Sequence, residues 1–487
     1  MAGRRWLRQL LRAFGRDQRG NAAVIFCFCA VPLAAGAGLA IDTMLAYSVE
    51  DQLQKSLDAA GLAAGRTALP EDVEADARSY FNTNFGAGAG FAELTDFDVD
   101  VNEVGDELTL TASAQMQTHF MRLFGHDTVT VAARTVINRQ VRGLELALVL
   151  DVTGSMVEDN KIGALKTAAA ELIDILYGDR ETVPDLWVSL VPYTGVVNIG
   201  TANKPFLAPS DQVNTAPSNF SPDTWAGCVM ARTAPRDQND DPPSVARFAS
   251  YLHPKRPRPT WPLYYDNDWG RTGIDPKTKR VDSYDNGVRY YEGYGPNQLC
   301  PDPITPLTAK KSTIKSRIAA LQPWHRQRGA THTNIGLVWG WRTLSPRWRG
   351  LWNGAPSDLP LDYATENMDK AVIVLTDGDN TLLTTTVNGS TASRYTAYPN
   401  LAALGATSSN VTTKLNQRTT SVCTAIKTAG ITVYAITFGD SPSSTGQSLM
   451  RGCASSPALY WHSPDGTNLR TVFRTIGTQL SKLRIAQ

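Results

Sequence analysis

The hydrophobic pattern of the chain begins with one long apolar segment. Residues 22–41 contain no charged side chain, and at about 1.5 Å per residue a helix of this length spans the roughly 30 Å of a bilayer's hydrocarbon core. After Asp42, apolar residues recur every third or fourth position until Ala64, which is the period of an amphipathic helix. We therefore expect one helix over residues 21–66, with its first half in a membrane and its second half outside. A membrane span followed by a separate stalk would have the same topology.

Residues 67–140 carry the pattern of a small α/β region. The pattern predicts a short helix from Glu71 to about Asn84, ended by a glycine-rich run. Three strands are expected after it, two of them with alternating apolar and polar residues. They cover residues 95–101, 107–114 and 128–137.

From Leu144 onward, apolar strands alternate with helices, which is typical of a parallel sheet covered by helices. The expected strands cover residues 144–150, 186–193, 371–376, 431–438 and 458–461. The expected helices cover residues 161–177, 333–343, 420–429 and 467–483. We assign residues 143–487 to this α/β domain. Residues 200–307 break the pattern and hold 16 of the 28 prolines together with many aromatic residues, so we expect an ordered insertion there.

The total charge says little, but its distribution predicts an orientation. The chain has 47 Lys and Arg against 46 Asp and Glu, so no net field favours nucleic acid as a partner. Residues 1–20 hold six arginines and a single acid, Asp17. A basic segment before a membrane span stays in the cytoplasm, and the rest of the chain would then be exported. A cleaved signal peptide, with Ala35-Gly36-Ala37 as its cleavage site, is the alternative.

The six cysteines are consistent with export. Cys27 and Cys29 lie in the apolar segment and are expected to be free thiols. The other four form an even set in the part expected outside the cytoplasm, where disulfides persist. Because none of them has the Cys-x-x-Cys spacing of a zinc site, we interpret them as disulfide partners rather than metal ligands.

The positions of these four cysteines suggest how they pair. Cys423 lies in the helix before the strand at 431–438, and Cys453 lies in the helical segment after it. Helices that flank one strand of a parallel sheet can be neighbours, so we expect Cys423 to bond to Cys453. Cys228 would then pair with Cys300 within the insertion.

Oxygen-bearing side chains follow two of the expected strands. Asp151, Thr153 and Ser155 come at the end of the first strand of the sheet, and Asp377 follows a later one. Thr333 lies in a loop between them. Ligand sites in open α/β sheets lie at the carboxyl ends of the strands, and carboxylate and hydroxyl oxygens are the ligands that hard cations prefer. The pattern therefore predicts a divalent-metal site, for Mg²⁺ or Mn²⁺.

In this order, the five residues resemble the metal-ion-dependent adhesion site of von Willebrand factor type A domains. That family has Asp-x-Ser-x-Ser, a distant Thr and a later Asp, which Asp151, Thr153, Ser155, Thr333 and Asp377 match. Thr153 stands where Ser is usual and keeps the hydroxyl. The resemblance implies a Rossmann-like, mostly parallel sheet. It also implies a non-enzymatic domain that binds a protein partner through a carboxylate on the metal.

The N-terminal segment is similar to another family. Residues 16–66 resemble the Tad (tight adherence) pilus proteins of the TadE/TadG type. The resemblance implies a single-pass protein of a bacterial inner membrane, with residues 1–20 in the cytoplasm and the C-terminal domain in the periplasm or at the cell surface. Its partners would be other pilus-assembly proteins or pilins. Pilin precursors are cut after a Gly that has a Glu five residues on, whereas Gly20 has Ile25 at that distance.

Two other functions are weighed against this one. A cell-surface adhesin or matrix-binding receptor unrelated to pili would use the aromatic insertion to contact its target. A metal-dependent hydrolase is disfavoured, because no nucleophile or general base accompanies the ligands and Ser155 is not in a G-x-S-x-G motif.

Two weaker patterns are set aside. Asp266-Asn267-Asp268 faintly resembles a calcium loop but lacks the Glu that closes an EF-hand loop. Four tryptophans could form a carbohydrate or protein patch, although a packed core cluster is the favoured interpretation. They are Trp339, Trp341, Trp348 and Trp352.

Overall fold

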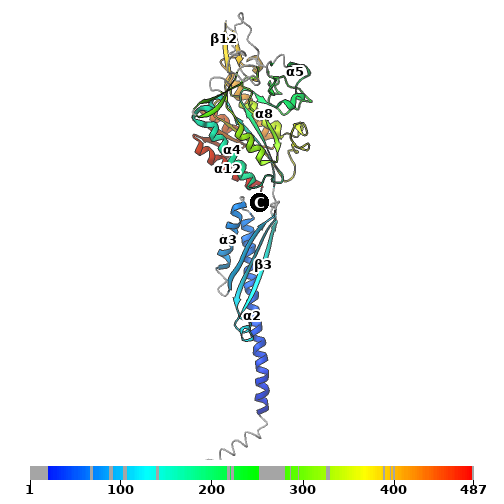
Figure 1. Ribbon diagram of the computed structural model, residues 1–487, viewed down its shortest axis with the longest axis vertical. Coiled ribbons are helices and arrows are strands. Elements are labelled where there is room, and N and C mark those ends of the chain that lie inside the picture. The colour runs from blue at the N-terminus through cyan, green and yellow to red at the C-terminus, as the bar shows by residue number, and fades with distance from the viewer. Residues whose placement is uncertain are drawn as a thin grey trace, which may run out of the picture. The chain divides into compact units, whose positions relative to one another are not determined.

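The computed structural model divides the chain into two compact units, residues 1–140 and 141–486 (Figure 1). The structure describes residues 20–65, 70–86, 92–102, 107–138, 142–216, 220, 224–251, 280–285, 287–293, 296–324, 330–387, 390–394, 396–398 and 401–484.

The first unit packs two helices against a three-stranded antiparallel sheet of order β1-β2-β3. Its elements are α2 (Gly20–Ala64), α3 (Pro70–Gly86), β1 (Ala92–Val101), β2 (Glu107–Gln117) and β3 (Thr128–Asn138). Buried and half-exposed side chains alternate along most of β2, because successive side chains of a strand point to opposite faces of the sheet. The helix and the three strands expected over residues 67–140 are therefore all present.

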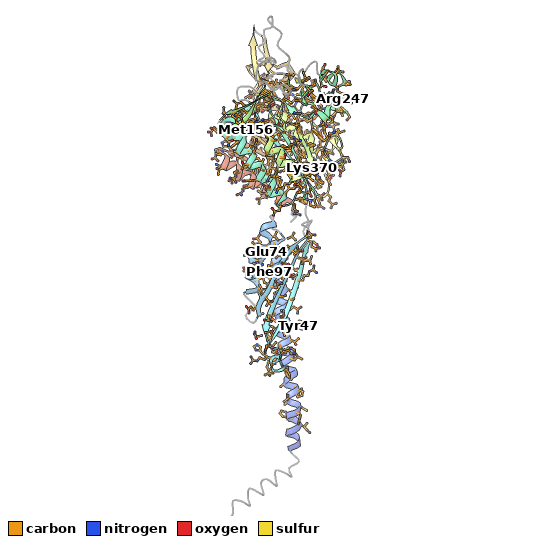
Figure 2. All side chains as sticks on the ribbon, viewed as in Figure 1. Tyr47, Glu74, Phe97, Met156, Arg247 and Lys370 are labelled. Carbon is orange, nitrogen blue, oxygen red and sulfur yellow. A yellow bond between two sulfur atoms is a disulfide. The ribbon has the colours of Figure 1, made fainter. Side chains whose placement is uncertain are left out.

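Only the second half of α2 joins the core of this unit. Its apolar stripe, from Val49 through Leu53 and Leu57 to Ala64, is buried against α3 and the sheet. Phe97 of β1 closes the core by packing on Phe81 of α3, with ring centroids 4.7 Å apart (Figure 2). The first half of α2 exposes its apolar side chains instead. Within the described part of the chain, α2 is the one helix long and apolar enough to cross a membrane.

The second unit is built on a sheet of order β15-β14-β11-β4-β5-β6-β7, with β10 also paired to β5. The five strands from β15 to β5 pair in parallel. This arrangement confirms the expected α/β fold class with a mostly parallel sheet. The strands are β4 (Gly143–Asp151), β5 (Leu186–Tyr193), β6 (Val197–Asn198), β7 (Cys228–Val229), β10 (Thr305–Thr308), β11 (Met368–Thr376), β14 (Thr432–Phe438) and β15 (Tyr460–Ser463).

Helices cover both faces of this sheet. On one face, α4 (Lys161–Tyr177) and α12 (Gly466–Arg484) lie side by side (Figure 1), with α7 (Lys311–Ala320) beside α4. On the other face lie α8 (Thr333–Leu344) and α10 (Val411–Thr428). Every residue of β4 is buried, which is why its sequence is almost continuously apolar.

Several helices differ from the expectation, α10 and α7 among them. The sequence predicts a helix that begins at residue 420, but α10 begins at Val411. In its first turns Val411 and Leu415 are the buried apolar residues and the residues between them are polar, so the apolar periodicity there is weak. The helix α7 was not predicted for the same reason, since it buries only Ile314 and Ile318.

The described part of the insertion joins the main core. Strands β6 and β7 extend the sheet. Along the chain, η3 (Thr201–Phe206) and α5 (Pro209–Asn214) lie between these two strands. Phe206 packs edge-on against Trp348 and Trp352, at 5.5 and 5.7 Å between ring centroids. All four tryptophans of the sequence-based cluster are buried, so they form core rather than a binding patch. The weak calcium pattern at residues 266–268 lies outside the described residues.

The structure contains both expected disulfides. Cys423 of α10 is bonded to Cys453 at the end of α11 (Ser444–Cys453), and Cys228 of β7 is bonded to Cys300. Cys29 is a free and exposed thiol. Each disulfide closes a long loop, of 30 and 72 residues respectively.

We predict that replacing Cys423 and Cys453 together by Ala lowers the free energy of unfolding of the second unit. Closing a loop of this length contributes about 3–4 kcal/mol through the restricted unfolded chain. Denaturant unfolding of the full chain measures the change. A Cys29→Ala variant, which removes a thiol without a disulfide, is the matched control. Equal stability of the double variant and the control would contradict the prediction.

Candidate metal site

Two adjacent parallel strands carry the acidic residues of the site. Strand β4 ends at Asp151, and Asp377 follows directly after β11. The register sets Leu150 beside Leu375, so both strands leave the sheet at the same edge. Both aspartates have no exposed surface. Tertiary structure therefore brings together two carboxylates that are more than two hundred residues apart in the sequence.

Hydrogen bonds join these carboxylates to the hydroxyl groups that the sequence predicted. Asp151 accepts hydrogen bonds from the backbone N–H of Thr153 at 2.8 Å and from the Thr376 hydroxyl at 2.9 Å. Asp377 accepts one from the Ser155 hydroxyl at 2.6 Å. The hydroxyls of Thr153 and Ser155 lie 3.2 Å apart. Four of the five predicted residues thus form one continuous cluster.

Thr333 lies next to this cluster. It is the first residue of α8, and its backbone N–H donates to the Asn380 side chain at 2.9 Å. Its side chain forms a hydrogen bond with Tyr193, and burial together with the charges of Asp151 and Asp377 raises the pKa of that tyrosine well above its ordinary value. The Tyr193 ring lies against Gly336 of α8, where a Cβ would come within 2.6 Å of the ring. This close approach holds the Thr333 end of α8 against the sheet edge.

Lys161 also belongs to this cluster, although it was not among the residues expected from the sequence. Its Nζ donates to Asp377 Oδ2 at 3.0 Å, and the lysine side chain is 7% exposed. Lys161 is also the first residue of α4. A cation is unfavourable at a helix N-terminus because the helix dipole is positive there. A lysine at the start of a predicted helix is therefore a signal that it pairs with an acid elsewhere, and this signal could have been used.

The electrostatics of the site favour a cation. Burial and the neighbouring Asp377 raise the pKa of Asp151 to about 7. Burial also raises the pKa of Asp377, although Lys161 acts in the opposite direction. Burial lowers the pKa of nearby His332 to about 3, so that ring is neutral. The lysine offsets only one of the two carboxylates, and a divalent ion could hold both.

The donor set fits a hard cation. It consists of two carboxylates and several hydroxyl oxygens, which suit Mg²⁺ with water or a partner in the remaining positions. No cluster of three or more His, Cys, Asp or Glu is found in the described part of the chain. The two carboxylates and the hydroxyl oxygens are the residues that could hold a divalent cation.

The insertion supports the threonine loop of the site. Asn334, next to Thr333, donates from its side chain to the Tyr398 hydroxyl at 2.8 Å, and that hydroxyl donates to Asp237 of the insertion at 2.9 Å. Asp237 also forms a buried ion pair with Arg418 of α10. The network ties α8, α10 and the insertion together behind the site.

A hollow of about 890 Å³ opens beside the cluster. Lys161 and Ser441 line its side nearest the metal residues, and Lys161 Nζ lies 3.4 Å from the Ser441 hydroxyl. Its wall also includes Glu158, Asp159 and Arg470. The residues that line this hollow do not include the five predicted ligands, so Lys161 is its link to the cluster.

Comparison with known proteins adds an independent finding for the N-terminal helix. Residues 20–67 match the family described as putative Flp pilus-assembly TadE/G-like. No curated protein matches the chain. The first half of the match covers the exposed apolar part of α2, and the second half covers its buried stripe.

Several solved structures are similar to the chain at low identity. The pilus adhesin SpaC from Lactobacillus rhamnosus GG is 12% identical with a TM-score of 0.34; the match covers 80% of this chain and 34% of SpaC, so the chain spans about a third of its length. The vWF domain of the type V pili tip protein Mfa5 from Porphyromonas gingivalis is 10% identical with a TM-score of 0.34, covering 71% of this chain and 97% of that domain. The proximal thread matrix protein 1 from the mussel byssus, with a zinc-occupied MIDAS motif, is 13% identical with a TM-score of 0.31, covering 70% and 46%.

Fold and site define the class of the molecule. It has an α/β domain with a mostly parallel sheet, and acidic and hydroxyl side chains lie at the carboxyl edge of that sheet. Ahead of that domain, the chain carries a TadE/G-like helical segment.

We predict that the metal-free protein loses stability as the pH rises. The pKa of Asp151 is about 7 in the folded protein against an ordinary value of 3.8, so the folded state binds this proton more tightly than the unfolded state. The resulting stabilisation is complete below about pH 4 and is lost as the pH rises through 7, with a limiting slope of about 1.4 kcal/mol per pH unit. An Asp151→Asn variant should flatten this dependence.

Denaturant unfolding of the full chain in EDTA, between pH 4.5 and 8, measures this effect. Asp379→Asn makes the same chemical change in the loop that follows Asp377, at a carboxylate that accepts a hydrogen bond from the Ser443 N–H. This control should keep the slope of the wild type. A wild-type slope in Asp151→Asn would mean that Asp151 is not the titrating group.

Proposed function

We propose that this protein is a membrane-anchored component of a Tad-type pilus that binds a protein partner through a divalent metal. The observation that carries the proposal is the pair of buried carboxylates, Asp151 and Asp377, at the carboxyl edge of the sheet. The TadE/G-like match of residues 20–67 supports the pilus context.

In this proposal, Asp151 and Asp377 hold the ion directly or through water. Thr153, Ser155 and Thr333 supply neutral oxygens. Once bound, the metal would offer an open coordination position to a carboxylate of the partner. Ser155 donates a hydrogen bond to Asp377, which leaves the lone pairs of its hydroxyl oxygen available to the ion. The proposed role is binding of a partner.

Lys161 changes the charge balance of the proposed site. Two carboxylates, one lysine and one divalent ion leave a single net positive charge. A site of that charge attracts an acidic partner group more strongly than the two carboxylates and the ion alone. Lys161 would thus weaken the hold on the metal but strengthen the hold on the partner.

The proposed location is the bacterial inner membrane, crossed once by the first half of α2. The exposed apolar side chains of that half favour lipid, with Phe28 77% and Val31 70% exposed. The six arginines before it would keep the N-terminus in the cytoplasm. The α/β domain would then lie in the periplasm or at the cell surface, where its two disulfides are stable. The proposed partners are pilins or other pilus-assembly proteins.

We predict that Asp151→Asn reduces the affinity for Mg²⁺ by more than about tenfold. Loss of an outer-shell partner costs 10–100-fold in metal affinity, and loss of a direct charged ligand should cost at least as much. Isothermal titration of Mg²⁺ and Mn²⁺ into the full chain in detergent measures it, with thermal melts to show that the variant is folded. Asp379→Asn should bind as the wild type does. Equal affinities in all three proteins would refute the metal site.

The same proteins test the role in binding. Pilus-assembly proteins and pilins from the native membrane should be retained by the wild type and by Asp379→Asn in Mg²⁺, and released by EDTA. Asp151→Asn should retain none of them. Retention that is unaffected by EDTA would separate partner binding from the metal.

We predict opposite effects of Lys161→Gln on the two binding steps. Affinity for Mg²⁺ should rise and affinity of the Mg²⁺-loaded protein for a glutamate-rich peptide should fall, each by roughly tenfold, because one nearby positive charge is removed. Lys166→Gln, from the same helix, is the matched control. Parallel changes in both affinities would show that Lys161 only stabilises the fold.

A further inference from the structure

The turn that joins β2 to β3 exposes large apolar side chains. This tip, defined here as residues 119–127, contains a short 3₁₀ helix over Met121–Phe124. Leu123 is 75% exposed and Phe124 is 65% exposed, and Phe120 is also exposed. Turns of a soluble sheet normally carry polar residues. Because these side chains are exposed, packing within the first unit does not explain why the tip is apolar.

The tip is fastened to α2 where the apolar segment of that helix ends. The buried carboxylate of Asp42 accepts hydrogen bonds from the backbone N–H groups of His119, Phe120 and Met121, at 3.0, 2.9 and 2.7 Å. Phe120 also lies against the helix at Gly38, where a Cβ would come within 2.6 Å of the ring. Gly38 belongs to the uncharged segment of residues 22–41. The tip thus reaches the level of that segment.

The hydrogen bonds to Asp42 also lower the cost of placing this acidic residue near the lipid. A carboxylate is costly in a water-poor environment unless its oxygens are hydrogen-bonded. Three backbone N–H groups satisfy Asp42 without water, and hydrogen bonds to an ionised oxygen are among the strong ones. The helix can therefore enter lipid up to Asp42.

The polar residues of the tip suit a lipid surface. His119, Arg122 and His126 flank the apolar side chains and are exposed, as is the acidic Asp127 just before β3. Basic and amphipathic side chains favour the headgroup region while neighbouring apolar groups lie deeper. Tyr47, exposed on α2 about one turn beyond Asp42 (Figure 2), is also of the type enriched at membrane interfaces.

We propose that the β2–β3 tip inserts into the headgroup–acyl boundary of the bilayer that α2 crosses. Leu123 and Phe124 would enter the lipid beside the helix, on the exported side. The occupant of this apolar surface is lipid because the surface is continuous with the exposed apolar face of α2. The first unit would then be held by two membrane contacts, which limits how freely it tilts about the helix. The inference rests on the proposed membrane anchoring of α2.

The test places an environment-sensitive fluorophore at single cysteines of the full chain in phosphatidylcholine–phosphatidylglycerol vesicles. One protein is labelled at the native Cys29, with Cys27 replaced by Ala. In two others both of these cysteines are replaced, and the label is at Leu123→Cys or Val136→Cys. Val136 is an exposed residue of β3, roughly 26 Å along the strand from its start at Thr128. Lipids with a quencher high or low on the acyl chain report depth.

Support for the proposal is a Leu123→Cys probe with blue-shifted emission that is quenched more by the shallow quencher than by the deep one. The Cys29 probe should be quenched more by the deep one, and the Val136→Cys probe by neither. Adding Leu123→Asp and Phe124→Asp to a chain labelled at His126→Cys should abolish quenching at the tip.

The other outcomes overturn the proposal. A tip probe in water while the Cys29 probe is in lipid leaves the anchor intact and refutes insertion. A blue-shifted but unquenched tip probe means that another protein, such as a second copy of the chain, covers the tip. Absence of quenching at Cys29 refutes the membrane anchor itself, and with it both proposals.

Discussion

The parallel pairing of β4 with β11 is the constraint on which the site of this protein depends. It makes Asp151 and Asp377 leave the sheet at the same buried edge, although they come from distant parts of the chain. Two carboxylates in a water-poor place repel each other, and Lys161 offsets only one of their charges. The remaining charge must be balanced by a proton or by a cation. The strand pairing that forms the fold therefore also creates the charge that the proposed metal would balance.

Two buried aspartates of the same chain show how environment decides the role of a carboxylate. Asp42 accepts three backbone N–H groups, so its charge is fully used in holding one loop to one helix. Asp151 accepts one backbone N–H and one hydroxyl and faces a second acid. The hydrogen bonds to Asp42 stabilise a local structure. The surroundings of Asp151 leave negative charge that a proton or a cation would balance. The same residue type is structural in one unit and a candidate ligand in the other.

The long insertion has a structural role that its composition did not suggest. Its described part completes the core beneath the tryptophans and reaches the site through Asp237, Tyr398 and Asn334. Arg418 of α10 neutralises Asp237 in this network. The start of α8, and with it Thr333, is therefore positioned by contacts from three separate segments. The four tryptophans that follow the insertion in the chain pack in the core, as the sequence favoured.

Local patterns in the sequence were sufficient for the elements and for the type of site. Apolar periodicity predicted α2, α4, the three strands of the first unit and the five parallel strands of the second, since each depends on residues close together in the chain. The spacing of Asp151, Thr153 and Ser155 indicated an oxygen-rich loop for the same reason. Weakly amphipathic helices such as α7 were missed, because a few buried isoleucines leave little periodic signal. Which charges meet is not a local property. The Lys161–Asp377 pair, the Asn380 support of Thr333 and the capture of the β2–β3 tip by Asp42 each join distant segments, and only packing of the whole chain determines them.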